Sequence, residues 1–140
     1  MAYDDNNVFA RIIRGELPCH KVLEDEATLA FLDISPGGRG HTLVLPKARA
    51  RNIFDIDDAA LAALVVRVRR VARAVHRAFG SDGVSIQQFN EEAAGQSVFH
   101  LHVHVVPRWE GIPLRLSGAR TAEKPEALAE QAALIRAALK

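Results

Sequence analysis

Cysteine, long apolar runs and net charge are what this 140-residue chain has least of. Cys19 is its only cysteine, which excludes an internal disulfide and is typical of a reducing cytoplasm. No apolar run approaches the roughly 20 residues that cross a bilayer. The start, Met1 to Asp5, is acidic and so unlike a secretory signal. We therefore expect a cytoplasmic protein with no membrane partner.

The formal net charge is only +1, although arginine is frequent between residues 67 and 77. Those arginines recur at helical spacing, which favours a solvated helix face over a basic binding patch. A chain with this balance is not a general nucleic-acid binder. Hydrophobic residues make up 49% of the chain, enough for one core, and the length predicts a single domain over residues 1–140.

Hydrophobic periodicity and turn residues predict both helices and strands. Helices are expected at residues 8–14, at residues 58–79 with Asp55 or Asp57 as the cap, and from Pro125 onward. Strands are expected at residues 21–25, 28–33, 41–46, 84–90 and 98–108. The short connections favour an antiparallel sheet with helices on one side, an α+β architecture.

The two ends of the chain differ in character. Residues 1–6 are expected to be disordered. Residues 110–140 form a C-terminal extension whose last helix is rich in alanine. That helix has one apolar edge, which could dock on the domain itself or on a second subunit.

The most informative stretch ends in the last predicted strand. His100, His102 and His104 occupy every second position, with apolar residues between them. A strand would place the three imidazoles on one face and the apolar groups on the other. A single histidine on a strand is more often structural than catalytic, and a His-x-His pair is also a common zinc arrangement.

A glycine-containing turn precedes this strand. Gly95 lets the backbone approach a ligand, and Gln96 and Ser97 supply a carboxamide and a hydroxyl. Asn90 closes the preceding strand, so the loop of residues 91–96 would lie beside the histidines. Imidazoles, amide donors and a hydroxyl suit chemistry at phosphorus, which depends on positioning and on charge stabilisation. Ser97 could instead be a simple turn hydroxyl.

The run His-Leu-His-Val-His-Val-Val at residues 100–106 resembles the signature of the histidine triad (HIT) family. The similarity extends from about Val8 to Arg108. It implies a HIT-like α+β fold, a five-stranded antiparallel sheet with a long helix and short N- and C-terminal helices. It also implies a homodimer that pairs through the exposed faces of the long helix and the fourth strand.

The resemblance assigns roles to the triad. The middle histidine, His102, would attack an α-phosphorus and form a nucleotidyl-histidine intermediate that water hydrolyses. Its second ring nitrogen would donate to the backbone carbonyl of His100. His104 would donate to phosphate oxygens, and His41 would support the site from beside His100. On the residues alone, His41 could simply end a strand.

The resemblance also assigns the substrate contacts. Gln96 and Ser97 match positions at the phosphate and leaving group, Gly95 would stabilise charge through nearby N–H groups, and Asn90 would lie near the phosphate. Asp33 would accept hydrogen bonds from the ribose hydroxyls. The residues expected to sandwich the base are Phe9, Ile12, Leu17, Phe31, Leu32 and Ile34. Without the resemblance, these apolar residues would be interpreted as core.

One departure from the family bears on metals. Many bacterial relatives carry Cys-x-x-Cys, which binds structural zinc together with two histidines, where this chain has Asn7-Val8-Phe9-Ala10. Two histidines without a thiolate make a weak zinc site. We therefore expect no structural zinc, no catalytic metal and no cofactor.

The leading functional prediction is an enzyme that hydrolyses adenosine or other purine nucleoside 5′-phosphoramidates and releases AMP. The Gly-Gln-Ser sequence favours this substrate class. Hydrolysis of dinucleoside polyphosphates and nucleotidyl transfer use the same intermediate and stay open, because residues beyond Arg108, including Trp109, could reshape the leaving-group side. A non-catalytic nucleotide-binding module is the alternative from another class.

Overall fold

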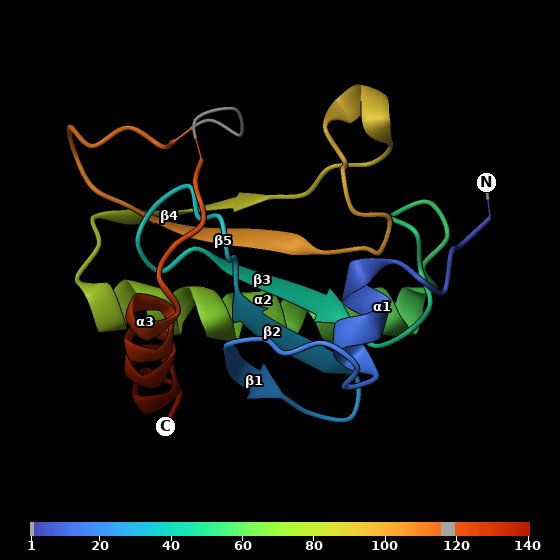
Figure 1. The fold of residues 1–140 in the computed structure, drawn as a ribbon, viewed down its shortest axis with the longest axis horizontal. Helices are drawn as coiled ribbons and strands as arrows, with labels where there is room; N and C mark the ends of the chain where they lie inside the picture. Colours follow the sequence, from blue (N-terminus) through green and yellow to red (C-terminus); the bar gives the residue numbers. More distant parts are fainter. Residues whose placement is uncertain (1, 116–119) are drawn as a thin grey trace.

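The computed structural model describes residues 2–115 and 120–140. Its sheet has the strand order β1-β2-β3-β5-β4, and every neighbouring pair is antiparallel (Figure 1). The strands are β1 (Lys21–Glu24), β2 (Thr28–Leu32), β3 (Thr42–Pro46), β4 (Gly83–Gln87) and β5 (Val103–Arg108). The α-helices in the described ranges are α1 (Val8–Ile13), α2 (Asp58–Phe79) and α3 (Pro125–Ala138). The predicted five-stranded α+β fold is confirmed.

The long helix α2 lies at the predicted residues because both of its ends are chemically marked. The Asp57 carboxylate accepts a hydrogen bond from the backbone N–H of Ala60 at 2.8 Å, which caps the first turn. Gly80 ends the helix in the left-handed conformation (φ 59°), and its N–H donates to the carbonyl of His76. Capping of this kind depends on neighbours in the sequence, so it can be seen in the sequence alone.

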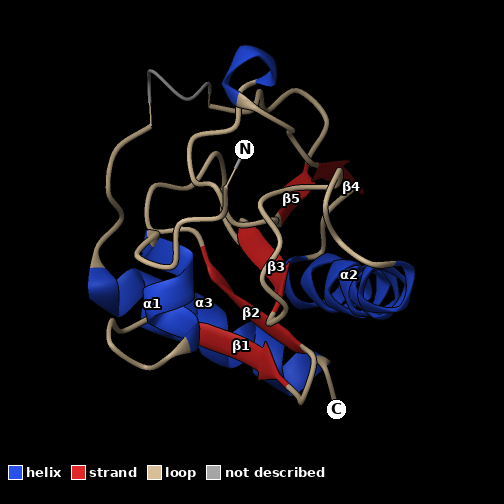
Figure 2. Cartoon of the chain, turned by 90° about the vertical axis from the view of Figure 1, so that its right-hand side faces the viewer, coloured by secondary structure: helices blue, strands red, loops and turns tan. Residues whose placement is uncertain are grey.

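The sheet separates two apolar layers. Ala30 and Leu32 of β2 pack with α2 and α3, whereas Leu29 and Phe31 pack with Phe9 of α1. Alternate residues of one strand point to opposite faces, so α1 lies on the side opposite α2, as Figure 2 shows. The prediction that all helices lie on one side is wrong for α1.

The C-terminal helix α3 docks on its own domain. Leu128, Ala132 and Ile135 are buried in the layer formed with α2. Of the two alternatives for its apolar edge, the domain itself is therefore the partner. Among the described residues, no helix has the length and apolarity needed to cross a bilayer.

The strand that carries the histidines is shorter than predicted, because β5 begins at Val103 and not at residue 98. Opposite it, β3 ends at Pro46, which has no N–H to donate to a ladder. The Pro46 carbonyl accepts from His100 Nε2 at 2.8 Å, and the Leu101 N–H donates to the Ala50 carbonyl at 2.9 Å. Residues 98–102 therefore lie outside the ladder, and the three imidazoles do not form one row.

The N-terminal residues are held in place, in contrast to the disorder predicted for residues 1–6. The Tyr3 hydroxyl donates to His100 Nδ1 at 2.6 Å. The Arg49 guanidinium lies 5.1 Å from the centroid of the Tyr3 ring and pairs with Asp5 at 2.7 Å. Residues 2–6 thus pack against the chain near its first triad histidine, while Met1 lies outside the described residues.

Candidate active site

A cavity of about 610 Å³ opens on the α1 side of the sheet. Its apolar wall includes Val8, Phe9, Ile12, Leu17, Phe31, Leu32 and Ile34. Its polar side and its glycine include Asp33, Ser35, Gly95, Gln96, Ser97, His102, His104 and Arg120. The structure therefore brings together the predicted base-binding residues, the predicted ribose acceptor and two triad histidines. His100, His41 and Asn90 lie outside its lining.

The ring of His102 is held in one tautomer. Its Nδ1 lies 2.7 Å from the backbone carbonyl oxygen of His100. A carbonyl only accepts hydrogen bonds, so Nδ1 carries the proton and Nε2 keeps its lone pair. Burial lowers the pKa of His102, so the ring is neutral at pH 7. A neutral imidazole with a free Nε2 lone pair is a competent nucleophile.

A backbone amide sets the tautomers of two further histidines. The Gly37 N–H donates to His41 Nδ1 at 2.8 Å, so His41 carries its proton on Nε2. His41 Nε2 donates to His104 Nδ1 at 2.9 Å. His104 must therefore carry its own proton on Nε2, as a neutral hydrogen-bond donor. The prediction placed His41 beside His100, but the structure places it beside His104.

Burial keeps this chain of rings uncharged. It lowers the pKa of His41 to about 3 and that of His104 to about 3, and the positive charge of Arg120 acts in the same direction on both. The relay from Gly37 to His104 thus consists of neutral donors and acceptors. It delivers an N–H donor, not a cation, to the cavity.

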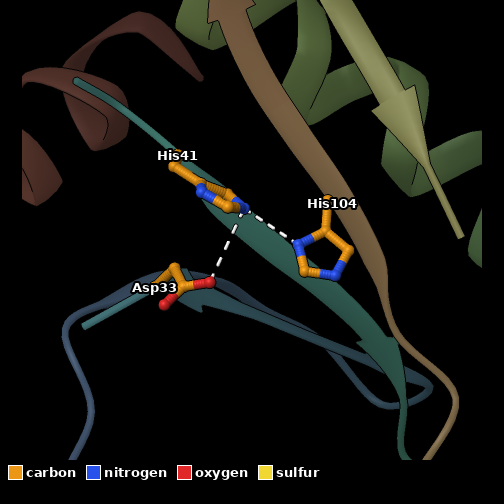
Figure 3. A group of neighbouring side chains, drawn as sticks. All are labelled: Asp33, His41 and His104. Atoms are coloured by element: carbon orange, nitrogen blue, oxygen red, sulfur yellow. Dashed lines mark hydrogen bonds and ion pairs between the residues drawn. The ribbon is translucent and has the colours of Figure 1, made fainter. Parts of the chain in front are cut away.

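Figure 3 shows the group formed by Asp33, His41 and His104, whose nearest ligand-type atoms all lie within 4.8 Å of one another. Two imidazoles and a carboxylate could in principle hold a metal ion. However, the Gly37 N–H occupies His41 Nδ1, so the Nε2 that faces Asp33 at 3.6 Å and His104 at 2.9 Å bears a proton. A hydrogen-bonded relay suits these atoms better than a metal centre.

Asp33 lines the cavity beside Ile34 and Ser35. Its Oδ1 accepts from the Ser35 N–H at 2.9 Å, and burial raises the pKa of its carboxyl. Arg120 Nη1 lies 3.7 Å from Asp33 Oδ2. Sequence reasoning missed Arg120, because it belongs to a stretch without periodicity and lies twelve positions after Arg108. No local pattern marks it.

His100 contributes to the site through its backbone. Its ring is buried between the Tyr3 hydroxyl, which donates to Nδ1, and the Pro46 carbonyl, which accepts from Nε2. Its carbonyl orients His102. The predicted contact between His102 and the His100 carbonyl is present, and Tyr3 is a partner that the sequence did not reveal.

Gln96, which was predicted to contact the phosphate, uses its side chain for hydrogen bonds within the protein. Gln96 Nε2 donates to the carbonyls of Arg51 (2.7 Å) and Val98 (3.1 Å), and its Oε1 accepts from the Glu91 N–H and from Asn52. All four of its hydrogen-bonding positions are filled. The Gln96 side chain lines the cavity, but it supports the loop and leaves no free group for a phosphate.

Asn90 does not line the cavity, in contrast to the prediction. Its Oδ1 accepts from the Ile53 N–H at 2.9 Å and from Gln88 Nε2 at 2.7 Å, and its Nδ2 donates to Gln88 Oε1. These bonds replace strand pairing beyond Gln87, so β4 ends before residue 90. Gly95 (φ 100°) and the exposed Ser97 remain along the cavity wall.

Known proteins resemble this chain over most of its length. The model of the HIT domain family matches residues 14–111. A Hit-like protein from Bartonella henselae has a TM-score of 0.91 and 47% identity, with 98% of this chain and 99% of that chain covered. The adenosine 5′-monophosphoramidase hnt1 of Schizosaccharomyces pombe is 36% identical over 72% of this chain and 73% of that protein. The adenylylsulfatase HINT3 of Arabidopsis thaliana is 40% identical over 74% of this chain and 52% of that protein.

Proposed function

Since this chain belongs to the histidine triad family, we propose that it hydrolyses adenosine or other purine nucleoside 5′-phosphoramidates and releases AMP. The observation that carries this proposal is the fixed tautomer of His102, which leaves a nucleophilic Nε2 in a cavity with an apolar wall and a carboxylate. The name of the fission-yeast relative, an adenosine 5′-monophosphoramidase, supports the same substrate class.

In this mechanism, His102 Nε2 forms a bond to the α-phosphorus while the bond from phosphorus to the leaving nitrogen breaks. The Ser97 hydroxyl delivers a proton to the departing amine. The His102 ring becomes cationic, and its Nδ1–H donates more strongly to the His100 carbonyl. Water then attacks the phosphorus, returns a proton to the Ser97 oxygen and breaks the bond to His102. AMP leaves and the neutral ring is restored.

The neighbouring groups stabilise charge during both steps. His104 Nε2–H is the donor for a phosphate oxygen, because its Nδ1 is engaged by His41. The N–H groups of Gly95 and Gln96 do not share this task, because they donate to the carbonyls of Glu92 (3.0 Å) and Glu91 (3.1 Å). Asp33 accepts from the ribose hydroxyls, and the apolar wall around Phe9 and Phe31 holds the base.

The name of the plant relative, an adenylylsulfatase, favours a second candidate substrate class, an adenylyl sulfate. A dinucleoside polyphosphate likewise has an anionic leaving group. Both are cleaved through the same His102 intermediate, and nucleotidyl transfer differs only in the acceptor.

The first test is intact-protein mass spectrometry during turnover of an adenosine phosphoramidate. We expect an AMP adduct on His102, and we expect His102→Asn to abolish adduct and turnover while it still binds AMP. His20→Asn, a histidine change outside the cavity lining, should leave turnover unchanged. A folded wild type that binds AMP but cleaves neither a phosphoramidate, a dinucleoside polyphosphate nor an adenylyl sulfate would instead be a nucleotide-binding module.

A further inference from the structure

Glu91 lies in the loop between β4 and β5, in a conformation that few residues other than glycine adopt. Its φ is 74° and its ψ is 159°, and in the described part of the chain it is the only non-glycine residue with a positive φ. Such conformations persist only where surrounding contacts enforce them, and they cluster at functional sites. The contacts that hold Glu91 therefore indicate what the strain serves.

The carboxylate of Glu91 is held by two consecutive residues that follow β3. Arg51 donates to both carboxylate oxygens, from Nε at 2.8 Å and from Nη2 at 2.9 Å. The Arg51 guanidinium also lies 4.1 Å from the centroid of the Phe99 ring. Asn52 Nδ2 donates to the same carboxylate. A two-pronged arginine pair with a stacked guanidinium fixes orientation as well as distance.

The same contacts continue to the other end of the loop. The Glu91 N–H donates to Gln96 Oε1 at 2.7 Å, and the buried Asn52 side chain donates to that oxygen at 3.1 Å. Gln96 in turn donates to the Arg51 carbonyl at 2.7 Å. These four residues, Arg51, Asn52, Glu91 and Gln96, form a closed ring of bonds that we call the Glu91 clamp. Residues 92–95 lie between its two ends.

The Glu91 clamp adjoins the cavity through Gln96, which belongs to both. Gly95, Gln96 and Ser97 line the cavity together with His102 and His104. Stability alone gives no reason for an ion pair to enforce an unfavourable backbone conformation, because a glycine would adopt it without strain. A fixed direction for the loop gives such a reason, because small displacements of groups that contact a reacting phosphate are costly.

We propose that the Glu91 clamp positions Gly95 and Ser97 against the α-phosphate, which makes Arg51, Asn52, Glu91 and Gln96 positioning residues for the reaction. This inference rests on the proposed function. It concerns the phosphate and not the base, because the clamp lies at the loop of residues 91–97, while the apolar wall lies in α1, in β2 and in the segments that follow them. AMP and adenosine should therefore respond differently to its loss.

The test uses Glu91→Gln and Arg51→Met in the full chain. We expect kcat for an adenosine phosphoramidate to fall by about ten- to a hundredfold, with a much smaller change in KM. The Kd for AMP should rise, and the Kd for adenosine should stay within about twofold of wild type. The matched control is Arg67→Met, which removes an ion pair to Asp25 of similar length, 2.9 Å, outside the cavity.

Glu91→Gly separates the clamp from the strain. Glycine adopts the backbone conformation freely but has no carboxylate, so the variant should melt no lower than Glu91→Gln and still lose kcat and AMP affinity. Retention of wild-type kcat and AMP affinity by Glu91→Gly would overturn the proposal. So would an equal loss of AMP and adenosine affinity in Glu91→Gln. A wild type without turnover would overturn the hydrolase proposal alone, because the comparison of AMP with adenosine still decides the clamp.

Discussion

At the scale of the residue, the site depends on where single protons lie. The Gly37 N–H fixes the proton of His41, His41 fixes that of His104, and the His100 carbonyl fixes that of His102. Among the described residues, none of these rings has a carboxylate at hydrogen-bond distance, and the nearest approach is that of Asp33 to His41 at 3.6 Å. The site thus holds neutral imidazoles with assigned donor and acceptor ends, as nucleophilic attack by one ring requires.

These buried histidines predict a loss of stability in mild acid. The pKa is lowered to about 3 for His41, about 3 for His104 and about 4 for His100, from an ordinary value of 6.5. Below pH 6.5 the unfolded chain takes up protons that the folded chain refuses. Stability is therefore full above pH 6.5 and falls as the pH drops toward 4, by at most about 1.4 kcal/mol per pH unit for each histidine.

Chemical denaturation at several pH values between 4.5 and 7.5 measures this slope. We expect His41→Asn to be less stable than wild type at pH 7.5 but to show a smaller slope below pH 6.5. An unchanged slope in His41→Asn would show that His41 is not held neutral in the folded protein.

The sequence revealed the residues that act through a local pattern. The alternation of residues 100–106 and the turn at Gly95 are visible as strings, and the structure places His102, His104 and Ser97 on one cavity. Partners chosen by tertiary contact were not visible. His41 meets His104 across 63 residues, and Arg120 reaches Asp33 from beyond the family's matched region.

At the scale of the element, the bounds were predicted correctly where the residues that determine them are close in sequence, and wrongly where those residues are distant. Helix α2 matched its predicted bounds because its cap and its left-handed glycine are adjacent to it in sequence. The start of β5 did not, because the residue that stops the ladder, Pro46, belongs to another strand. The N-terminal segment was predicted to be disordered because its anchor, His100, lies 97 residues from Tyr3.

That segment is expected to act on the site through one hydroxyl. Tyr3→Phe keeps the edge-on contact with the His100 ring, 5.6 Å between centroids, but removes the donor to Nδ1. A buried acceptor without a partner costs about 1–3 kcal/mol. We therefore expect a lower melting temperature and, because the His100 carbonyl orients His102, a fall in kcat of about tenfold.

The measurement is the steady-state kinetics of Tyr3→Phe beside its thermal denaturation. The control, Arg49→Met, removes the cation over the Tyr3 ring and the pair with Asp5 but leaves the hydroxyl in place. It should retain most of the wild-type kcat. Equal losses in both variants would mean that only the docking of the segment matters.

At the scale of the whole molecule, the sheet has two edge strands, β1 and β4. In the order β1-β2-β3-β5-β4, β4 is an edge strand with unpaired backbone groups along one side. Ile86 of β4 is half-exposed, and it shares a face with Val84, which packs on the α2 layer. Val65 and Val66 of α2 are also about half-exposed. An open edge beside free apolar side chains suits pairing with another sheet.

We propose that a second copy of this chain covers that surface, which gives a homodimer with a twofold axis at β4 and α2. Ile86→Lys and Val65→Lys should each shift the protein from dimer to monomer in analytical ultracentrifugation, because a stable interface cannot bury an unpaired ammonium in its apolar centre.

The control is Leu134→Lys on α3, at a similarly exposed apolar position away from β4, which should leave the dimer intact. A wild type that sediments as a monomer at every concentration, or a dimer that survives both changes, would contradict this assignment. The cavity lies on the opposite face of the sheet from α2. In the dimer it would therefore remain open to substrate in each subunit.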